Sequence, residues 1–98
     1  MIEVEIHPDA SAEPEATEEF YESRLGGFGL RFLLAIESGI WRIEIFPQSE
    51  SSLSEGFREV VVPGFPFSIV YQEAQDQIMI LAVAHHYRLP GYWLNRSQ

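Results

Sequence analysis

The chain has 98 residues, of which 46% are hydrophobic and 13% aromatic, so it is long enough for one domain with a modest core. Six arginines, no lysine and 15 acidic residues give it a formal net charge of −9. Nucleic acid is held by clustered cations, so this charge argues against a broad basic surface for DNA or RNA. Without cysteine, the chain offers no disulfide, no thiolate nucleophile and no Cys-ligated metal.

We expect a single domain over residues 1–98, located in the cytoplasm and not in a membrane. Residues 1–5 alternate apolar and acidic side chains and lack the basic segment that opens a signal peptide. The longest apolar run, residues 78–84, is far shorter than the ~20 residues that span a bilayer.

The charge is unevenly distributed along the chain. Residues 1–25 carry eight acids and only Arg24, a net charge of −7, whereas residues 77–98 carry two arginines and no acid, a net charge of +2. Such asymmetry indicates different surfaces for different partners.

The first elements are a strand and a helix. Residues 2–6 alternate with period two, which predicts a half-buried strand. A helix then begins near Asp9 or Ser11, either of which can cap it, and Pro14 fits its first turn if Ser11 is the cap. Four-residue steps predict an apolar face of Ala12, Ala16 and Phe20. The helix ends at the Gly26-Gly27 pair.

A second helix is predicted from about residue 29 to residue 45. Its buried stripe is spaced at helical intervals and comprises Phe32, Ile36, Ile40 and Ile43. Pro47 closes the helix, and residues 48–55 form a polar, serine-rich connection without periodicity. A short glycine-rich turn between the two helices makes an antiparallel hairpin.

The rest of the chain is predicted to be β-structure. Residues 57–62 end in three β-branched valines before a Pro-Gly turn, and residues 67–71 alternate. Residues 78–84 are continuously apolar, which favours a strand in the interior of the sheet. The order is β-α-α-β-β-β, which predicts an α+β fold with a two-helix hairpin on a small, mainly antiparallel sheet.

The last strand and the residues after it carry a distinctive pattern. Residues 81–96 (LAVAHHYRLPGYWLNR) closely resemble the C-terminal signature of RelE/ParE-superfamily toxins, with an apolar strand, His, Arg three residues on, Pro, and Tyr-Trp followed by Arg. Residues 56–58 and 65–71 resemble the family's second and third strands, and residues 29–32 with Pro47 resemble its second helix. The resemblance covers nearly the whole chain and implies the RelE/ParE toxin fold.

That superfamily divides into two kinds of type II toxin–antitoxin toxin. RelE-like members cut messenger RNA on the ribosome with a basic surface, whereas ParE-like plasmid-stabilisation proteins poison DNA gyrase by protein contact. A chain with no lysine and a charge of −9 would approach ribosomal RNA against repulsion, which favours the ParE-like branch. We therefore expect a gyrase-inhibiting toxin neutralised by a cognate antitoxin. The alternatives are a ribosome-dependent endoribonuclease and a degenerate, non-toxic module that still binds an antitoxin.

Four residues are candidates for catalysis if the chain is a nuclease, namely Arg58, His85, Arg88 and Tyr92. Guanidinium groups can stabilise a phosphorane-like charge, and histidine can act as an acid or base near neutral pH. Structural roles compete with this interpretation. Arg58 can pair with a nearby carboxylate, and a strand-end histidine bonded to backbone is favoured over a catalytic His85. Adjacent histidines on a strand face opposite sides, so His85 and His86 do not form a metal site.

For a binding function, the expected target or antitoxin interface is Arg88, Tyr92, Trp93 and Arg96. Tyr92 and Trp93 fold back over the sheet or, if exposed, anchor an interface. We expect no cofactor and no metal. The expected partners are a cognate antitoxin and either gyrase or the ribosome, and a homodimer is compatible with this interpretation. The acidic first helix departs from the basic antitoxin groove that is usual in these toxins, which shifts weight to hydrophobic contacts.

Overall fold

The computed structural model describes residues 3–48, 51–54 and 56–97. The expected start of the first strand at Ile2 lies outside these residues. The elements, in chain order, are β1 (Glu3–Ile6), α1 (Pro8–Arg24), α2 (Phe28–Ile45), β2 (Ser51–Ser54), β3 (Phe57–Val61), β4 (Phe67–Ala74), β5 (Gln77–His85) and a 3-10 turn, η1 (Leu94–Arg96). No helix among the described residues is long and apolar enough to cross a membrane.

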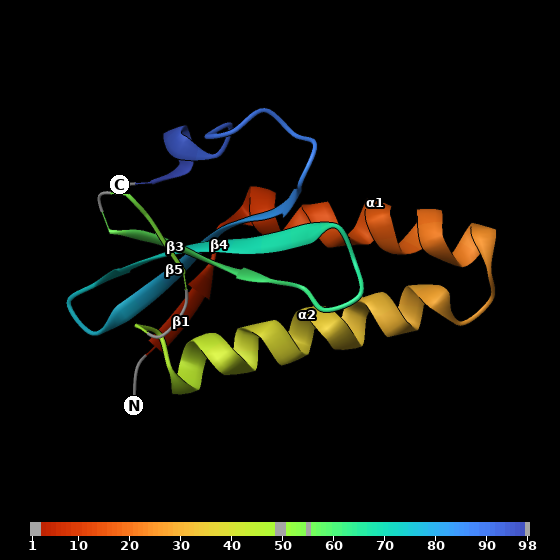
Figure 1. Cartoon of the computed structure of the whole chain (residues 1–98), viewed down its shortest axis with the longest axis horizontal. Helices are drawn as coiled ribbons and strands as arrows, with labels where there is room; N and C mark the ends of the chain where they lie inside the picture. The colour runs from red at the N-terminus through yellow and green to blue at the C-terminus, as the bar shows by residue number, and fades with distance from the viewer. Residues whose placement is uncertain (1–2, 49–50, 55, 98) are drawn as a thin grey trace.

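The strands form one five-stranded sheet in the order β1-β5-β4-β3-β2. β1 pairs in parallel with β5, and the other neighbours are antiparallel. The two helices form an antiparallel hairpin along one side of the sheet, and the C-terminal tail (residues 86–97) lies on the other side (Figure 1). The predicted α+β fold, its helix hairpin and the interior position of β5 are confirmed.

The sequence prediction missed one strand. β2 lies within the polar segment that we expected to be an irregular connection, and it pairs antiparallel with β3. Its residues, Ser-Ser-Leu-Ser, carry little hydrophobic alternation because β2 is an edge strand, and its register shifts between Ser52 and Ser54. Hydrophobic periodicity therefore gave no signal for it.

α1 starts earlier than predicted and presents a different face. His7 is its N-cap, with Nδ1 accepting a hydrogen bond from the Asp9 amide at 3.1 Å, and Pro8 occupies the first helical position. Pro14 consequently lies inside the helix and not in its first turn. The expected apolar face was wrong, since all three of its residues are exposed, namely Ala12, Ala16 and Phe20. The inward face carries Ala10, Glu13, Thr17 and Tyr21. Because this face includes a carboxylate, it does not stand out as an apolar face in the sequence.

Two clusters of buried side chains cover the two faces of the sheet. The larger packs α2 residues such as Phe32, Ile36 and Ile43 on the sheet, which confirms the predicted stripe, with Ile40 packed against it. The smaller lies on the opposite face and contains Trp93, whose ring packs edge-on against Phe57 with centroids 5.0 Å apart. The tail therefore folds back over the sheet, as one of the two sequence interpretations expected.

The α1–α2 turn generates a stability prediction. A Cβ on Gly29 would lie 2.9 Å from the Glu18 backbone oxygen, whereas a Cβ on Gly26 would meet nothing closer than 3.9 Å. Gly29→Ala should therefore force the two helices apart and lower the free energy of unfolding by about 1–3 kcal/mol in urea titrations. Gly26→Ala is the matched control and should change it by less than about 0.5 kcal/mol. Equal free energies of unfolding for the two variants would contradict the close approach of Gly29 to the Glu18 backbone.

Candidate functional site

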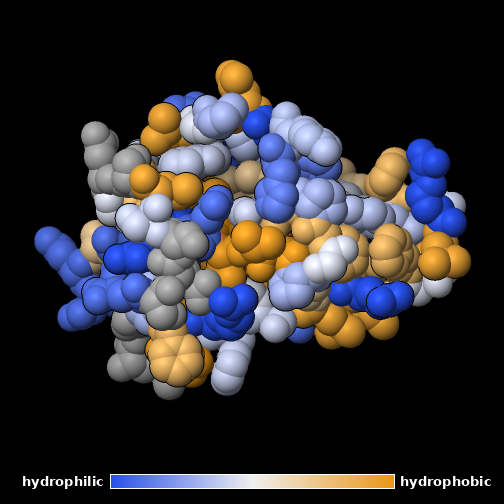
Figure 2. Space-filling view, in the orientation of Figure 1, coloured by the Kyte–Doolittle hydropathy of each residue, from blue (hydrophilic) through white to orange (hydrophobic). Residues whose placement is uncertain are grey.

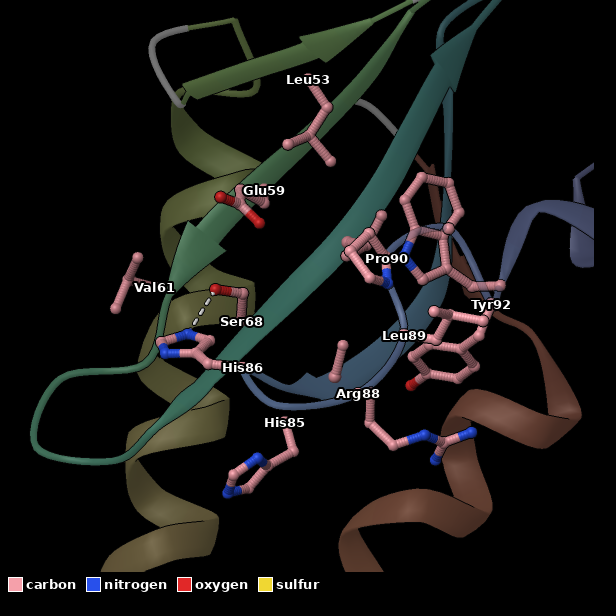
Figure 3. A pocket seen from close by; sticks show the side chains of 14 residues that line it. Leu53, Glu59, Val61, Ser68, His85, His86, Arg88, Leu89, Pro90 and Tyr92 are labelled. Atoms are coloured by element: carbon pink, nitrogen blue, oxygen red, sulfur yellow. Dashed lines mark hydrogen bonds between the residues drawn. The ribbon is translucent and has the colours of Figure 1, made fainter.

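A groove of about 410 Å³ opens on the sheet face that the helices leave uncovered. Its floor includes Val61 and Ser68 from β3 and β4, and its wall is formed by tail residues such as Leu89, Pro90 and Tyr92 (Figure 3). Val61 and Leu89 are exposed apolar side chains, and the charged residues of the lining are Glu59 and Arg88. A surface of this kind suits an apolar segment of a partner better than a small polar substrate.

The tail that forms this wall is fixed by one carboxylate of α1. Glu13 Oε1 accepts hydrogen bonds from the Val83 amide at 2.9 Å and from Arg96 Nη1 at 3.1 Å, and Oε2 accepts one from the Tyr92 hydroxyl at 2.6 Å. Arg96 Nη1 also donates to the Leu81 carbonyl at 2.9 Å. We call these five residues the Glu13 cluster. It joins α1, β5 and the tail, three parts of the chain that are far apart in sequence.

The position of the cluster follows from the sheet. In the described part of the chain, β1 pairs with β5 only as far as Ile80, where the chain turns into α1. Beyond that point Glu13 and Arg96 bond to backbone groups of β5 in place of a neighbouring strand. Buried backbone groups need such partners, because leaving one unpaired costs about 1–3 kcal/mol.

Tyr92 is held between the Glu13 cluster and Arg88. The Arg88 guanidinium carbon lies 3.8 Å from the centre of the Tyr92 ring, and that of Arg96 lies 5.2 Å away. Arg88 itself is exposed, on the turn that follows β5 (Figure 3). Its charge is therefore presented at the edge of the groove on a fixed aromatic ring, an arrangement worth roughly 0.5–1 kcal/mol at an exposed site.

Burial, together with the hydrogen bond and the charge of Glu13, raises the pKa of Tyr92 to about 12. The phenol is therefore neutral near pH 7, and its proton is directed at a carboxylate within the protein. Both facts make Tyr92 a poor general base, although sequence reasoning had included it among the catalytic candidates.

The two histidines diverge at the end of β5. His85 Nδ1 accepts a hydrogen bond from the Tyr87 amide at 3.0 Å, and its ring packs edge-on against Phe67. His86 lies in the groove, where its Nε2 is 2.9 Å from the hydroxyl oxygen of Ser68 (Figure 3). His85 is thus a strand-end histidine bonded to backbone, the structural role favoured from the sequence. Within the described ranges, no three His, Cys, Asp or Glu side chains are placed to hold a metal ion.

Arg58 is separated from the other candidates. It alternates along β3 with Phe57 and Glu59, which face the tail side, and shares the helix side with Val60. His85, Arg88 and Tyr92 line the groove together, but Arg58 does not. The four catalytic candidates therefore do not converge on one point. Of the four interface candidates, Arg88, Tyr92 and Trp93 line the groove, and Arg96 lies in the Glu13 cluster.

Sequence reasoning missed Glu13, which it had counted only as one of the eight acids of residues 1–25. Its side chain is only 17% exposed and pairs with Arg96, which is 14% exposed. One signal could have found it. Glu13 falls in helical phase with Ala10, Thr17 and Tyr21, so an inward face drawn through those positions contains a single acid that requires a partner.

One comparison with known proteins identifies a family. The family model described as "ParE toxin of type II toxin-antitoxin system, parDE" matches residues 4–90. The structure is similar to a chain of the chromosomal ParDE TA system from P. aeruginosa, with a TM-score of 0.76 and 19% identity, over 87% of this chain and 96% of that chain. At this identity the likeness bears on the fold alone. No curated protein sequence matches the chain. The family match includes Glu13 and Arg88 and ends before Tyr92.

The pKa of Tyr92 generates a prediction on alkaline titration. Because this pKa rises from 10.0 to about 12 in the folded chain, the resulting stabilisation is present below pH 10 and is lost as the pH rises through 12. Absorbance at the tyrosinate band should show a transition near pH 12 that is lost in Tyr92→Phe. A wild-type minus Tyr92→Phe difference curve centred near pH 10 would contradict the buried hydrogen bond.

Proposed function

We propose, since the chain belongs to the ParE toxin family of type II toxin–antitoxin systems, that it inhibits DNA gyrase by protein contact and that a cognate antitoxin neutralises it. Gyrase acts on the chromosome, so this target places the toxin in the cytoplasm. The contact that we assign to the target is the groove beside the tail, with Arg88 at its edge.

The observation that carries this proposal is that the four catalytic candidates do not form one RNA-cleaving site. His85, Arg88 and Tyr92 line the groove, but Tyr92 donates its proton to Glu13 and Arg58 lies on the opposite side of the sheet. General acid–base cleavage requires its groups within hydrogen-bonding reach of one phosphate. An apolar groove edged by one exposed arginine instead matches the composition of protein interfaces, in which arginine and aromatic residues carry much of the binding energy.

The charge distribution supports the same surface. The tail belongs to the segment of net charge +2, in which Arg96 is paired with Glu13 and Arg88 is exposed, while the rest of the chain is strongly acidic. A partner's acidic patch is therefore steered toward the tail and away from the remaining surface, whereas a phosphate backbone meets net repulsion. This arrangement favours a protein target over ribosomal RNA.

We assign the antitoxin to a different surface, an apolar stripe on the outer side of α2. The stripe consists of Leu30, Leu34, Trp41 and Ile45, which are each 49–60% exposed. At 100° per residue these four positions fall within a single face, opposite the buried stripe of α2. Apolar side chains gather along the lower edge of the molecule, where α2 runs (Figure 2). An amphipathic antitoxin helix would bury them by packing along α2.

The target assignment predicts the effect of Arg88→Ala. This variant should weaken inhibition of gyrase supercoiling about tenfold or more, because arginine is enriched among the hot spots of protein interfaces. Arg24→Ala is the matched control, since Arg24 is also an exposed arginine stacked on an aromatic ring, that of Phe20. Circular dichroism should be unchanged in both variants. Prompt messenger-RNA cleavage by the wild type, with gyrase unaffected, would overturn the proposal.

The antitoxin assignment predicts a change in tryptophan fluorescence. Trp41 is 60% exposed and Trp93 is buried, so the emission of Trp41 should shift to shorter wavelength when the cognate antitoxin binds. The shift should be absent in Trp41→Phe, which keeps an aromatic side chain on the stripe. A complex that forms with no change in Trp41 emission would place the antitoxin elsewhere.

A further inference from the structure

We propose that Glu13 is a positioning residue for the target contact, acting through Tyr92 to fix the guanidinium of Arg88 at the edge of the groove. This inference rests on the proposed function for its biological meaning. The positioning itself is a property of the isolated chain and can be tested without a target.

The first step is the chemistry of the Glu13 site. Every group within hydrogen-bonding distance of the two Glu13 oxygens is a donor, namely the Val83 amide, the Tyr92 hydroxyl and the Arg96 guanidinium. A carboxylate satisfies all of them because it only accepts. Glutamine has the same shape but would turn an NH₂ group toward one of these donors. The site therefore selects for a carboxylate and not merely for a side chain of this size.

The second step is the path from Glu13 to Arg88. The Tyr92 hydroxyl has its 2.6 Å bond to Glu13 at one end of the ring, and the Arg88 guanidinium stacks on the face of the same ring at 3.8 Å. Without the hydrogen bond to Glu13, the Tyr92 side chain can rotate about its torsions, and the ring on which Arg88 stacks then moves. Arg88 would then sample several orientations, and binding it in one of them would cost conformational entropy.

The third step is the separation of this role from simple folding. Trp93 holds the tail on the sheet through its contact with Phe57, independently of Glu13. Loss of the Glu13 charge should therefore loosen the region around Tyr92 while the tail remains in place. For this reason Glu13→Gln is expected to stay folded, with the near-UV signal of Trp93 intact.

The experiment has a target-independent arm. Stacking on Tyr92 should shift the Arg88 side-chain protons upfield in NMR spectra, and this shift should fall by at least half in Glu13→Gln. The wild-type shift should be kept in Glu15→Gln, which removes the same charge from an exposed position of α1. In Glu13→Gln the pKa of Tyr92 should also fall toward its ordinary value. An Arg88 shift that survives Glu13→Gln overturns the proposal, whatever the target is.

The second arm is a double-mutant cycle on toxicity. Induced growth arrest and gyrase supercoiling are measured for Glu13→Gln, Arg88→Ala and the double variant. We expect Glu13→Gln alone to weaken inhibition threefold to tenfold, and to have no further effect once Arg88 is gone. Additive losses would mean that Glu13 acts by general stability, which overturns positioning. Growth arrest without gyrase inhibition would refute the proposed target. The double-mutant cycle measured on growth arrest would still test the positioning role of Glu13.

Discussion

The arrangement of this toxin depends on one carboxylate, Glu13, set between a helix, the end of a strand and the C-terminal tail. β1 ends too early to cover the last part of β5, and the Tyr92 and Arg96 side chains of the tail donate hydrogen bonds that need an acceptor there. Glu13 meets both needs by accepting bonds from the Val83 amide, Tyr92 and Arg96. Without a carboxylate at this position, buried donors on two elements would lack an acceptor.

This constraint changes how the acidity of the chain is interpreted. The net charge of −9 is mostly carried by exposed acids, which keep the helix hairpin side away from anionic partners. Glu13 instead belongs to the interior and neutralises the guanidinium of Arg96, so that Arg88 is left as the exposed cation of the tail turn. The same tail thus contains one arginine used for structure and another available for recognition.

Much of the fold could be predicted from the sequence, because the features involved are local. The apolar stripe of α2 and the continuous apolar run of β5 can be recognised as buried from the sequence alone. The predictions failed where burial depends on distant partners. β2 is a polar edge strand, and the inward face of α1 contains Glu13, whose partners lie 70 or more residues away. For the same reason, the candidate arginines Arg58 and Arg96 could be named from the sequence but not placed, since strand register and tail folding decide which face each occupies.

The central claim is that this toxin acts by protein contact through the groove beside its tail. Hydrogen–deuterium exchange of the toxin with and without purified gyrase tests it most directly. Exchange should slow in residues 86–94 and in β3, which together border the groove, and should be unchanged on the outer side of α2. Protection confined to α2, or no protection by gyrase at concentrations that stop supercoiling, would contradict it.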